Sequence, residues 1–321
     1  MSIKKVIDVV DKSINGYMDK VPGIQKTIYS EILQITKELK LDARGNIKNT
    51  IDNYRLLNNL RSRLSKVIFT KDYHKITQQL VKSYDEINST IKDYFSSFAT
   101  SASSTTEEIL KILRNQSVER TVMYLGESGI NVNIIGKVQE LLQSNITTGG
   151  SYASYVDQLK EFITGSKDNL GAFQKYANTI VVDGLNTYSR TYTNAIVDDL
   201  GLEWFQYTGT LLTTSRAWCD HMVKKRFVHK SELNTILTDN IDGIEICSEE
   251  IPCGKNKLPS GMKKETTVSN LLNLAGGWNC GHRFIPIDEV IVPKEIKIKV
   301  YNSNEYKLWC TQNGITPNVA A

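Results

Sequence analysis

The chain has 321 residues, 40% of them apolar and 23% charged, with a formal net charge of +4 at pH 7. This length can bury a sizeable core and divide into two or three units. The N-terminus MSIKKVIDVVDKSING interrupts its apolar residues with lysines and aspartates, so it lacks the apolar core of a signal peptide. No stretch approaches the roughly 18 to 20 apolar residues of a membrane span. We therefore expect a soluble protein that is made in the cytoplasm.

Residues 1–100 are predicted to form a helical arm or bundle. Further helices are predicted over 24–39 and 48–69, separated by a turn at LDARGN. The apolar residues of this segment recur at helical spacing, which favours packing between helices over membrane binding. The segment holds 17 Lys and Arg against 11 Asp and Glu, an excess typical of a solvated face, with phosphate or an acidic partner as the alternative. The clearest stripe, on a helix of about six turns, consists of Ile76, Leu80, Tyr84, Ile87, Ile91, Tyr94 and Phe98.

A second helical domain is expected over residues 101–200. The polar stretch TSASSTTEE marks a hinge or boundary, and Thr105 or Thr106 followed by Glu108 resembles a helix N-cap. The last helix of this segment carries Asp183 and Arg190 as charges in its middle. Helices are predicted over 107–126, 131–145, 151–164 and about 170–199.

The pattern changes after Gly201. LEWFQYTGTLLTT alternates bulky and polar residues, which indicates a strand or hairpin. Residues 201–292 are expected to form a small α+β module with short strands and one helix near 230–238. A tail, 293–321, follows and opens on the strand-like EIKIKVY. The expected fold class is thus mainly α, with a helical N-terminal two thirds and a small α+β C-terminal domain.

A repeated Trp-Cys-x-His pattern is the most informative feature of this module. It occurs in SRAWCDH, residues 215–221, and in GGWNCGHRFIPI, residues 276–287. Residues i and i+2 face the same side of an extended chain but lie about 200° apart on a helix. Each Cys-x-His pair can therefore converge only if its segment is extended or turned. If so, Cys219, His221, Cys280 and His282 offer a tetrahedral zinc set, although neither pair has the C-x2-C form of a zinc knuckle.

Packing is the preferred interpretation of these cysteines, because free cysteine is among the most buried residue types. On this interpretation Cys219 and Cys280 are small core residues where two segments meet, and no cofactor is needed. Zinc binding and a disulfide formed in an oxidising medium are the alternatives. Cys247 and Cys253 are expected in a surface loop, with a metal or disulfide clip as the alternative.

Asp220, His221, Asn279 and His282 also suggest a metal-dependent nuclease of the His-Asn-His type. Such a site needs a histidine-bearing strand that leads into a helix with the last ligand. The sequence CGHRFIPIDEVIVP has two prolines and no helical period after His282, which argues against it. We expect no enzymatic activity.

Residues 175–290 resemble the C-terminal module of phage Mu F-like head morphogenesis proteins, the minor capsid proteins of tailed phages. That family shows a Tyr-x-Gly strand, a Thr-x-Arg-x-x-Cys segment and a closing Cys-x-Cys or Cys-x-His before a proline. The chain departs from the pattern at MVKKRF, which lacks the usual glycine turn, and at Gly281, which stands where an arginine is frequent. The matching residues are Tyr207, Gly209, Thr214, Arg216, Cys219, Phe227, Glu232, Gly277, Cys280, His282 and Pro286.

The resemblance implies a structural virion protein at the portal vertex or capsid interior that acts in head morphogenesis, genome packaging or delivery. Its partners would be portal or other capsid proteins, with packaged DNA as a further candidate, and it would associate with the virion as an oligomer. It would be located in the virion head, and in the host cytoplasm during assembly. A DNA-binding virion protein is an alternative, in which the basic helices contact DNA. In the module, arginines would brace loops by pairing with carboxylates or carbonyls and Trp218 and Trp278 would fill the core. The expected structural clamp consists of Arg216, Trp218, Cys219, Trp278, Cys280, His282 and Arg283.

Overall fold

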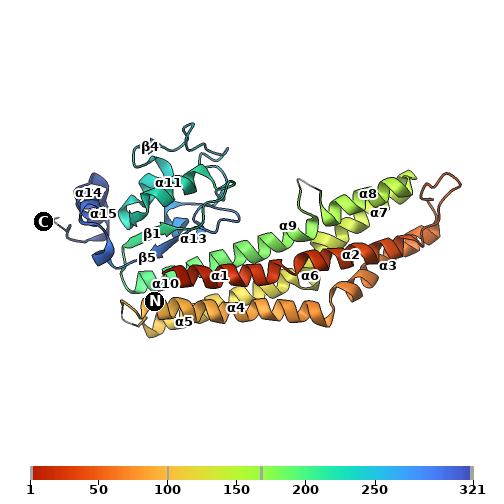
Figure 1. The fold of residues 1–321 in the computed structure, drawn as a ribbon, viewed down its shortest axis with the longest axis horizontal. Coiled ribbons are helices and arrows are strands. Elements are labelled where there is room, and N and C mark those ends of the chain that lie inside the picture. The colour runs from red at the N-terminus through yellow and green to blue at the C-terminus, as the bar shows by residue number, and fades with distance from the viewer. Residues whose placement is uncertain (1–2, 100, 167–168, 319–321) are drawn as a thin grey trace. The chain divides into compact units, whose positions relative to one another are not determined.

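A computed structural model describes residues 3–99, 101–166 and 169–318. The chain is mainly α-helical, and its short antiparallel strands all lie after residue 200, which confirms the expected fold class (Figure 1). Within the described residues no helix combines the length and apolar character needed to cross a membrane. The helical elements of the first 200 residues are α1 (Ile3–Met18), α2 (Val21–Thr36), α3 (Ile51–Ile68), α4 (Lys71–Phe95), α5 (Ser104–Leu125), α6 (Glu127–Ile130), the π-helix η1 (Asn131–Ile135), α7 (Gly136–Thr148), α8 (Tyr152–Thr164), α9 (Ala172–Asn178), the π-helix η2 (Thr179–Asp183) and α10 (Gly184–Asp199).

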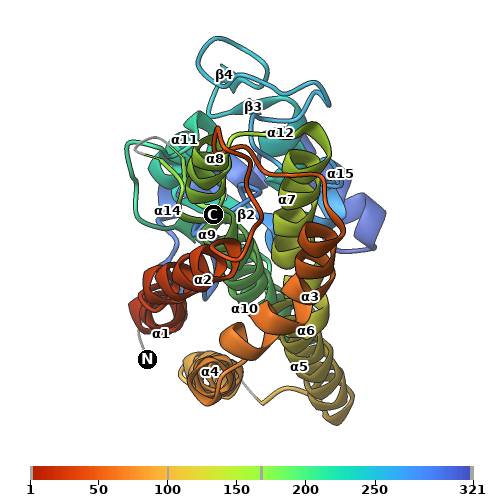
Figure 2. The same cartoon turned by 90° about the vertical axis from the view of Figure 1, so that its right-hand side faces the viewer.

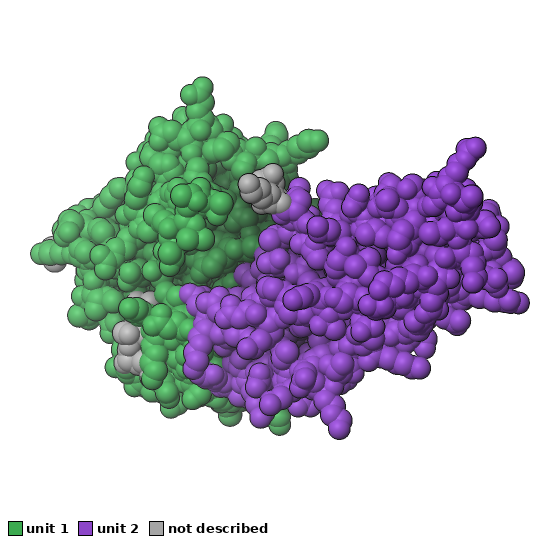
Figure 3. Space-filling model, turned by 45° about the vertical axis from the view of Figure 1, so that its right-hand side comes forward, with its two compact units in different colours: residues 1–9, 87–114, 185–321 green, residues 10–86, 115–184 purple. Residues whose placement is uncertain are grey.

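Two compact units are distinguished by their internal contacts (Figure 3). Unit 1 comprises Met1–Val9, Ile87–Arg114 and Leu185–Ala321, and unit 2 comprises Val10–Glu86 and Asn115–Gly184. Helices α1, α4 and α5 contribute residues to both units, and α10 contributes its first residue, Gly184, to unit 2 and the rest to unit 1. This division into units does not test the domain boundaries expected from sequence at residues 100, 200 and 292, which stay predictions.

Unit 2 is a bundle of amphipathic helices. Helix α2 packs against α3, α8 and α9, and α3 also packs against α7 (Figure 2). The contacts come from apolar residues at helical spacing, such as Ile28 and Ile32 on α2 and Leu60 and Leu64 on α3, all almost fully buried. Helix α2 begins at Val21, earlier than predicted, because Pro22 needs no hydrogen-bonded N–H in the first turn.

Helix α4 confirms the apolar stripe that the sequence predicts. Leu80, Tyr84, Ile87, Ile91 and Tyr94 are all buried at 6% exposure or less, as expected for residues that return to one face every three or four positions. The helix ends at Phe95, one turn before the end of the stripe.

The N-cap of α5 differs from the predicted one. Ser103, and not Thr105 or Thr106, accepts a hydrogen bond from the Thr106 backbone N–H through its side-chain oxygen (3.2 Å). Asp199 fixes this serine, since its carboxylate accepts bonds from both the backbone N–H and the hydroxyl of Ser103, each at 2.7 Å. The choice of Ser103 as the cap thus depends on Asp199, which is 96 positions away and cannot be read from the local sequence.

The C-terminal part of unit 1 holds a three-stranded antiparallel sheet in the order β2-β1-β5. On β1, Phe205 lies opposite Pro286 of β5 and Val228 of β2. Tyr94 of α4 donates a hydrogen bond of 2.6 Å from its buried hydroxyl to the Pro286 carbonyl. The strands and helices of this part are β1 (Trp204–Thr208), α11 (Ala217–Lys225), β2 (Phe227–His229), η3 (Lys230–Glu232), α12 (Leu233–Thr238), β3 (Asn240–Ile241), β4 (Ile244–Glu245), η4 (Val268–Asn270), α13 (Leu271–Leu274), β5 (Arg283–Pro286), η5 (Glu289–Ile291), α14 (Lys294–Tyr301) and α15 (Asn304–Asn313).

The expectation of a strand-like tail is wrong. EIKIKVY forms helix α14, and α15 follows, with the Ser303 side chain capping its first turn. The alternation of Ile296, Ile298 and Val300 imitates a strand, but Ile296 and Val300 are also one helical turn apart and face the same cluster. That cluster, called here the C-terminal aromatic core, consists of Trp204, Phe227, Ile287, Val292, Val300, Tyr301, Tyr306 and Cys310, with Ile296 and Trp309 at its edge.

His229 should make the stability of this region depend on pH. Its ring is fully buried against Trp204 and Tyr306 (ring centroids at 5.0 and 5.3 Å). Burial, helped by Lys230, lowers the pKa of His229 to about 4, although Glu203 Oε2 lies 3.3 Å from its Nε2. In the unfolded chain the pKa of His229 is near 6.5, so this histidine binds a proton at a higher pH than in the folded chain. The free energy of unfolding therefore falls as pH falls from about 6.5 to 4.

We expect this loss to reach about 3 kcal/mol at pH 4, measured by chemical denaturation at a series of pH values. His229→Gln should flatten that part of the curve, whereas His74→Gln, at an exposed position, should leave it unchanged. Equal slopes for the wild type and His229→Gln would contradict the assignment.

Candidate functional site

The two Trp-Cys-x-His segments meet inside unit 1. Cys219 Sγ lies 3.9 Å from Cys280 Sγ, although the residues are 61 positions apart, and Cys280 Sγ lies 3.6 Å from His282 Nδ1. All three side chains are buried. Within the part of the chain that the structure describes, these are the residues whose Cys, His or carboxylate ligand atoms gather closely enough to hold a metal ion.

His221 is not part of this group, because it lies on a helix and points away from Cys219. Residues Ala217–Lys225 form α11, so Cys219 and His221 point to sides of the helix about 200° apart. The Nε2 of His221 instead lies 4.0 Å from Glu250 Oε2. By contrast, Cys280 and His282 lie outside any helix, between a turn and β5, and their side chains contact each other there.

Arg190 of α10 holds the backbone that carries two of these side chains. Its buried guanidinium donates hydrogen bonds to the carbonyls of Cys280 and His282, the latter at 2.7 Å. The Cys219 thiol, followed by His282 and the Arg190 charge, lowers the pKa of Cys280. The same hydrogen bond and burial raise the pKa of Cys219. Sequence reasoning noted Arg190 only as a mid-helix charge, because its carbonyl partners lie about 90 residues further along the chain.

Glycines and a tyrosine shape the space around the cluster. A Cβ on Gly276 would lie 2.4 Å from Cys219 Sγ and 2.8 Å from Cys280 Sγ, so only glycine leaves room for both sulfurs. Gly209 similarly lies against the ring of His282. Tyr207 stacks on that ring at 5.8 Å and donates a hydrogen bond of 3.4 Å to Cys219 Sγ. Tyr207 and Gly209 belong to the family-like motif, whereas Gly276 was not singled out from sequence.

The remaining residues of the expected clamp have separate places. Trp218 is buried and donates its indole N–H to the Ile236 carbonyl at 2.8 Å. Trp278 does not fill the core, because it is 48% exposed and carries the Lys263 ammonium 4.4 Å above its ring. Arg216 donates to the Trp278 carbonyl, and buried Arg283 donates to Asn186 Oδ1 at 2.7 Å. Both arginines thus bind carbonyl-type oxygens.

The loop with the other two paired cysteines is closed by a disulfide between Cys247 and Cys253. This is the clip that the sequence left as an alternative to an open surface loop. Both residues are consequently absent from the set of free thiols, which among the described residues comprises Cys219, Cys280 and Cys310.

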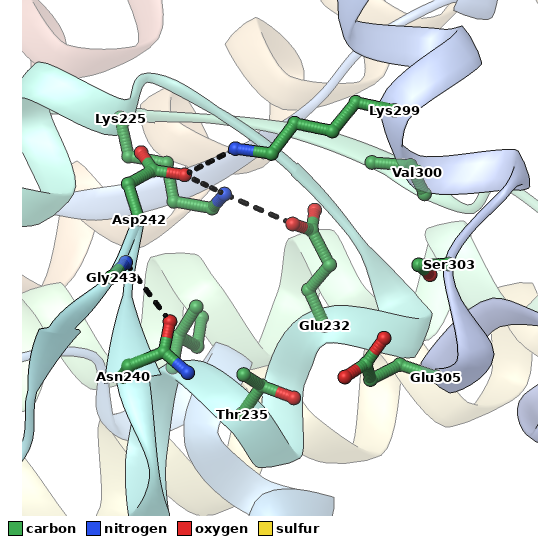
Figure 4. A pocket seen from close by; sticks show the side chains of 11 residues that line it. Lys225, Glu232, Thr235, Asn240, Asp242, Gly243, Lys299, Val300, Ser303 and Glu305 are labelled. Atoms are coloured by element: carbon green, nitrogen blue, oxygen red, sulfur yellow. Dashed lines mark hydrogen bonds and ion pairs between the residues drawn. The ribbon is translucent and has the colours of Figure 1, made fainter.

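A polar cavity of about 210 Å³ lies elsewhere in unit 1 (Figure 4). Lys225 forms ion pairs with Glu232 at 2.9 Å and Asp242 at 3.1 Å, and Lys299 pairs with the same Asp242 oxygen at 3.2 Å. Burial disfavours the charge on Lys225, but the two carboxylates outweigh it and raise its pKa. The ion pair between Lys299 and Asp242 ties α14 to the module. Because the lysines and carboxylates pair with one another, little unpaired charge is left to bind a ligand.

Comparisons of the chain with protein-family models, curated proteins and solved structures find no match.

Gly276→Ala should destabilise unit 1 by about 1–3 kcal/mol, because the new methyl group overlaps both sulfurs. Gly281→Ala is the matched control, since a Cβ there meets nothing within 4 Å. Thermal and urea unfolding of the two variants measure the difference. If Gly276→Ala is as stable as Gly281→Ala, the tight packing at the sulfurs is refuted.

Arg190→Met should cost about 3–5 kcal/mol, since it leaves the buried carbonyls of Cys280 and His282 without their donor. Arg61→Met, at an exposed site on α3, should change stability by no more than about 0.5 kcal/mol. Urea unfolding followed by tryptophan fluorescence reports the comparison. A loss at Arg190 no larger than that at Arg61 would contradict the role of the guanidinium.

Proposed function

We propose that this chain is a structural minor head protein of a tailed phage, located at the portal vertex or the capsid interior. In this role it acts in head morphogenesis, genome packaging or genome delivery, in contact with portal or other capsid proteins. It belongs to the virion and passes through the host cytoplasm during assembly.

The observation that carries the proposal is the meeting of the two motif segments at the 3.9 Å contact between Cys219 and Cys280. The resemblance to Mu F-like proteins requires that these segments, distant in sequence, form one module. Other motif residues support the same module: Gly209 lies against His282, and Glu232 accepts a 2.9 Å hydrogen bond from the His229 backbone. The motif side chains thus serve to hold backbone segments together, which favours a structural role over a catalytic one.

Helix α5 supports a role in assembly with other proteins. An amphipathic helix normally buries its apolar residues on one side, yet α5 buries Leu110 and Leu125 while other apolar side chains of the helix stay exposed. Such exposed residues are suited to packing against the helices of a partner. They are Ile109, Ile112, Val122 and Met123, each between 45% and 55% exposed.

The direct test is mass spectrometry of purified procapsids and virions of the phage that encodes the chain. We expect the protein in one or both particles at a copy number well below that of the major capsid protein. Deletion of its gene should reduce the yield of infectious, DNA-filled particles. Absence of the protein from both particles would refute the proposal.

Ile112→Asp should lower incorporation into particles at least several-fold, because it places a charge on the exposed apolar side of α5. Gln143→Asp adds the same charge at a polar, exposed position on another helix, α7, and should be incorporated normally. Quantitative immunoblotting of particles, with circular dichroism of the purified variants, measures both effects. Equal incorporation of the two variants would exclude α5 as the assembly surface.

The nuclease and DNA-binding alternatives are separated by assays on the purified chain. Wild type, His221→Ala and His282→Ala are incubated with DNA and Mg²⁺, Mn²⁺ or Zn²⁺. Equal cleavage by all three proteins, or none, removes the nuclease, whereas metal-dependent cleavage lost in both variants would favour it over the structural role. Binding to DNA that weakens steeply with salt would favour the DNA-binding alternative.

A further inference from the structure

We propose that Cys219, Cys280 and His282 bind one zinc ion, which fastens α11 to the segment that leads into β5. The proposal goes beyond the head-protein role and does not depend on it. It differs from the four-ligand set that the sequence suggested, because His221 projects from another side of α11.

The spacing of the ligand atoms fits a tetrahedral zinc ion. Zinc–sulfur bonds of about 2.3 Å and zinc–nitrogen bonds of about 2.0–2.1 Å require sulfurs about 3.8 Å apart and a sulfur–nitrogen separation of about 3.6 Å. The structure has 3.9 Å between the two Sγ atoms and 3.6 Å between Cys280 Sγ and His282 Nδ1. All three ligand atoms lie within 4.8 Å of one another. The ligands could therefore close on an ion with small shifts.

His282 is poorly satisfied unless a further partner is present. Its ring is 6% exposed, its Nδ1 faces the sulfur of Cys280, and its Nε2 makes no hydrogen bond with any described residue. Buried polar groups normally have strong partners, and a thiol sulfur is a weak one. A metal ion at Nδ1 would give this imidazole a strong interaction in place of the weak contact.

The surroundings hold the three ligands in place before any ion binds. Arg190 fixes the carbonyls of Cys280 and His282, Tyr207 stacks on the His282 ring, and Gly276 lies against both sulfurs. Such support from the second layer of residues is typical of metal sites, where it fixes the orientation of the ligands.

The ligand types select zinc among common cations. Two thiolates and one imidazole are soft or borderline ligands, which suit zinc and not Mg²⁺ or Ca²⁺. Two thiolates also balance the charge of a divalent ion, so the buried site would be neutral. No acidic side chain of the described residues joins the group, so the fourth ligand of the ion would be a small molecule such as water.

The test measures zinc bound to the full-length protein after reconstitution and removal of free metal. We expect about one zinc per wild-type chain, as for a specific tetrahedral site, and at least a tenfold loss in Cys219→Ser, Cys280→Ser and His282→Asn. Two matched controls should keep the zinc: Cys310→Ser removes a buried free thiol outside the cluster, and His221→Asn removes the other histidine of the motif.

Cobalt substitution provides a readout that does not require stable variants. Wild type loaded with Co²⁺ should show thiolate-to-cobalt charge-transfer absorption and the visible bands of a tetrahedral ion, and zinc should displace both. A wild-type chain that binds neither metal, or that carries a Cys219–Cys280 disulfide when purified under reducing conditions, would overturn the proposal. So would loss of zinc from His221→Asn as complete as that from His282→Asn. None of these results bears on whether the protein is found in particles, so failure of the zinc site and failure of the head-protein role can be told apart.

Discussion

The hydrogen bonds from Arg190 to the carbonyls of Cys280 and His282 are the interaction on which the C-terminal module depends. Burying a guanidinium is costly unless its donors are satisfied. Here the two Nη atoms donate to the carbonyls of Leu274, Cys280 and His282, and the positive charge lies near the Cys280 sulfur. One side chain of α10 therefore holds the backbone of Cys280 and His282 just before the chain enters β5. The cysteines, the histidine and the glycines around them are arranged about a segment that this arginine has already positioned.

A second constraint is the helical conformation of residues 217–225. Because α11 is a helix, it can direct only one of Cys219 and His221 towards β5, and it is Cys219 that contacts Tyr207 and Gly276. The two Trp-Cys-x-His segments are alike in sequence but not in structure: one is helical, and the other is a turn that leads into β5. Their tryptophans differ correspondingly, since Trp218 is buried and Trp278 is half exposed. The repeated sequence motif thus adopts two different backbone conformations, and the two copies meet at their cysteine sulfurs.

Sequence reasoning predicted features that depend on local periodicity and failed where distant contacts decide. The stripe on α4, the helix near 230–238 and the strand at β1 follow from residue spacing and type. In the tail, EIKIKVY satisfies both the strand and the helix period, and only packing of Ile296 and Val300 on the C-terminal aromatic core selects the helix. At the site, the proximity of Cys219 and Cys280 was anticipated, but the departure of His221 required knowledge that α11 is helical. The role of Arg190 depends on residues about 90 positions away, which no local pattern contains.

The hydrogen bond from Tyr94 to the Pro286 carbonyl joins residues 192 positions apart. During translation at about 5–20 residues per second, the tyrosine leaves the ribosome roughly 10–40 s before its acceptor is made. Through that interval unit 1, to which buried residues of α4 such as Ile91 belong, lacks its C-terminal segment. The nascent chain therefore passes through a state that is vulnerable to aggregation, and it completes unit 1 only after β5 has emerged.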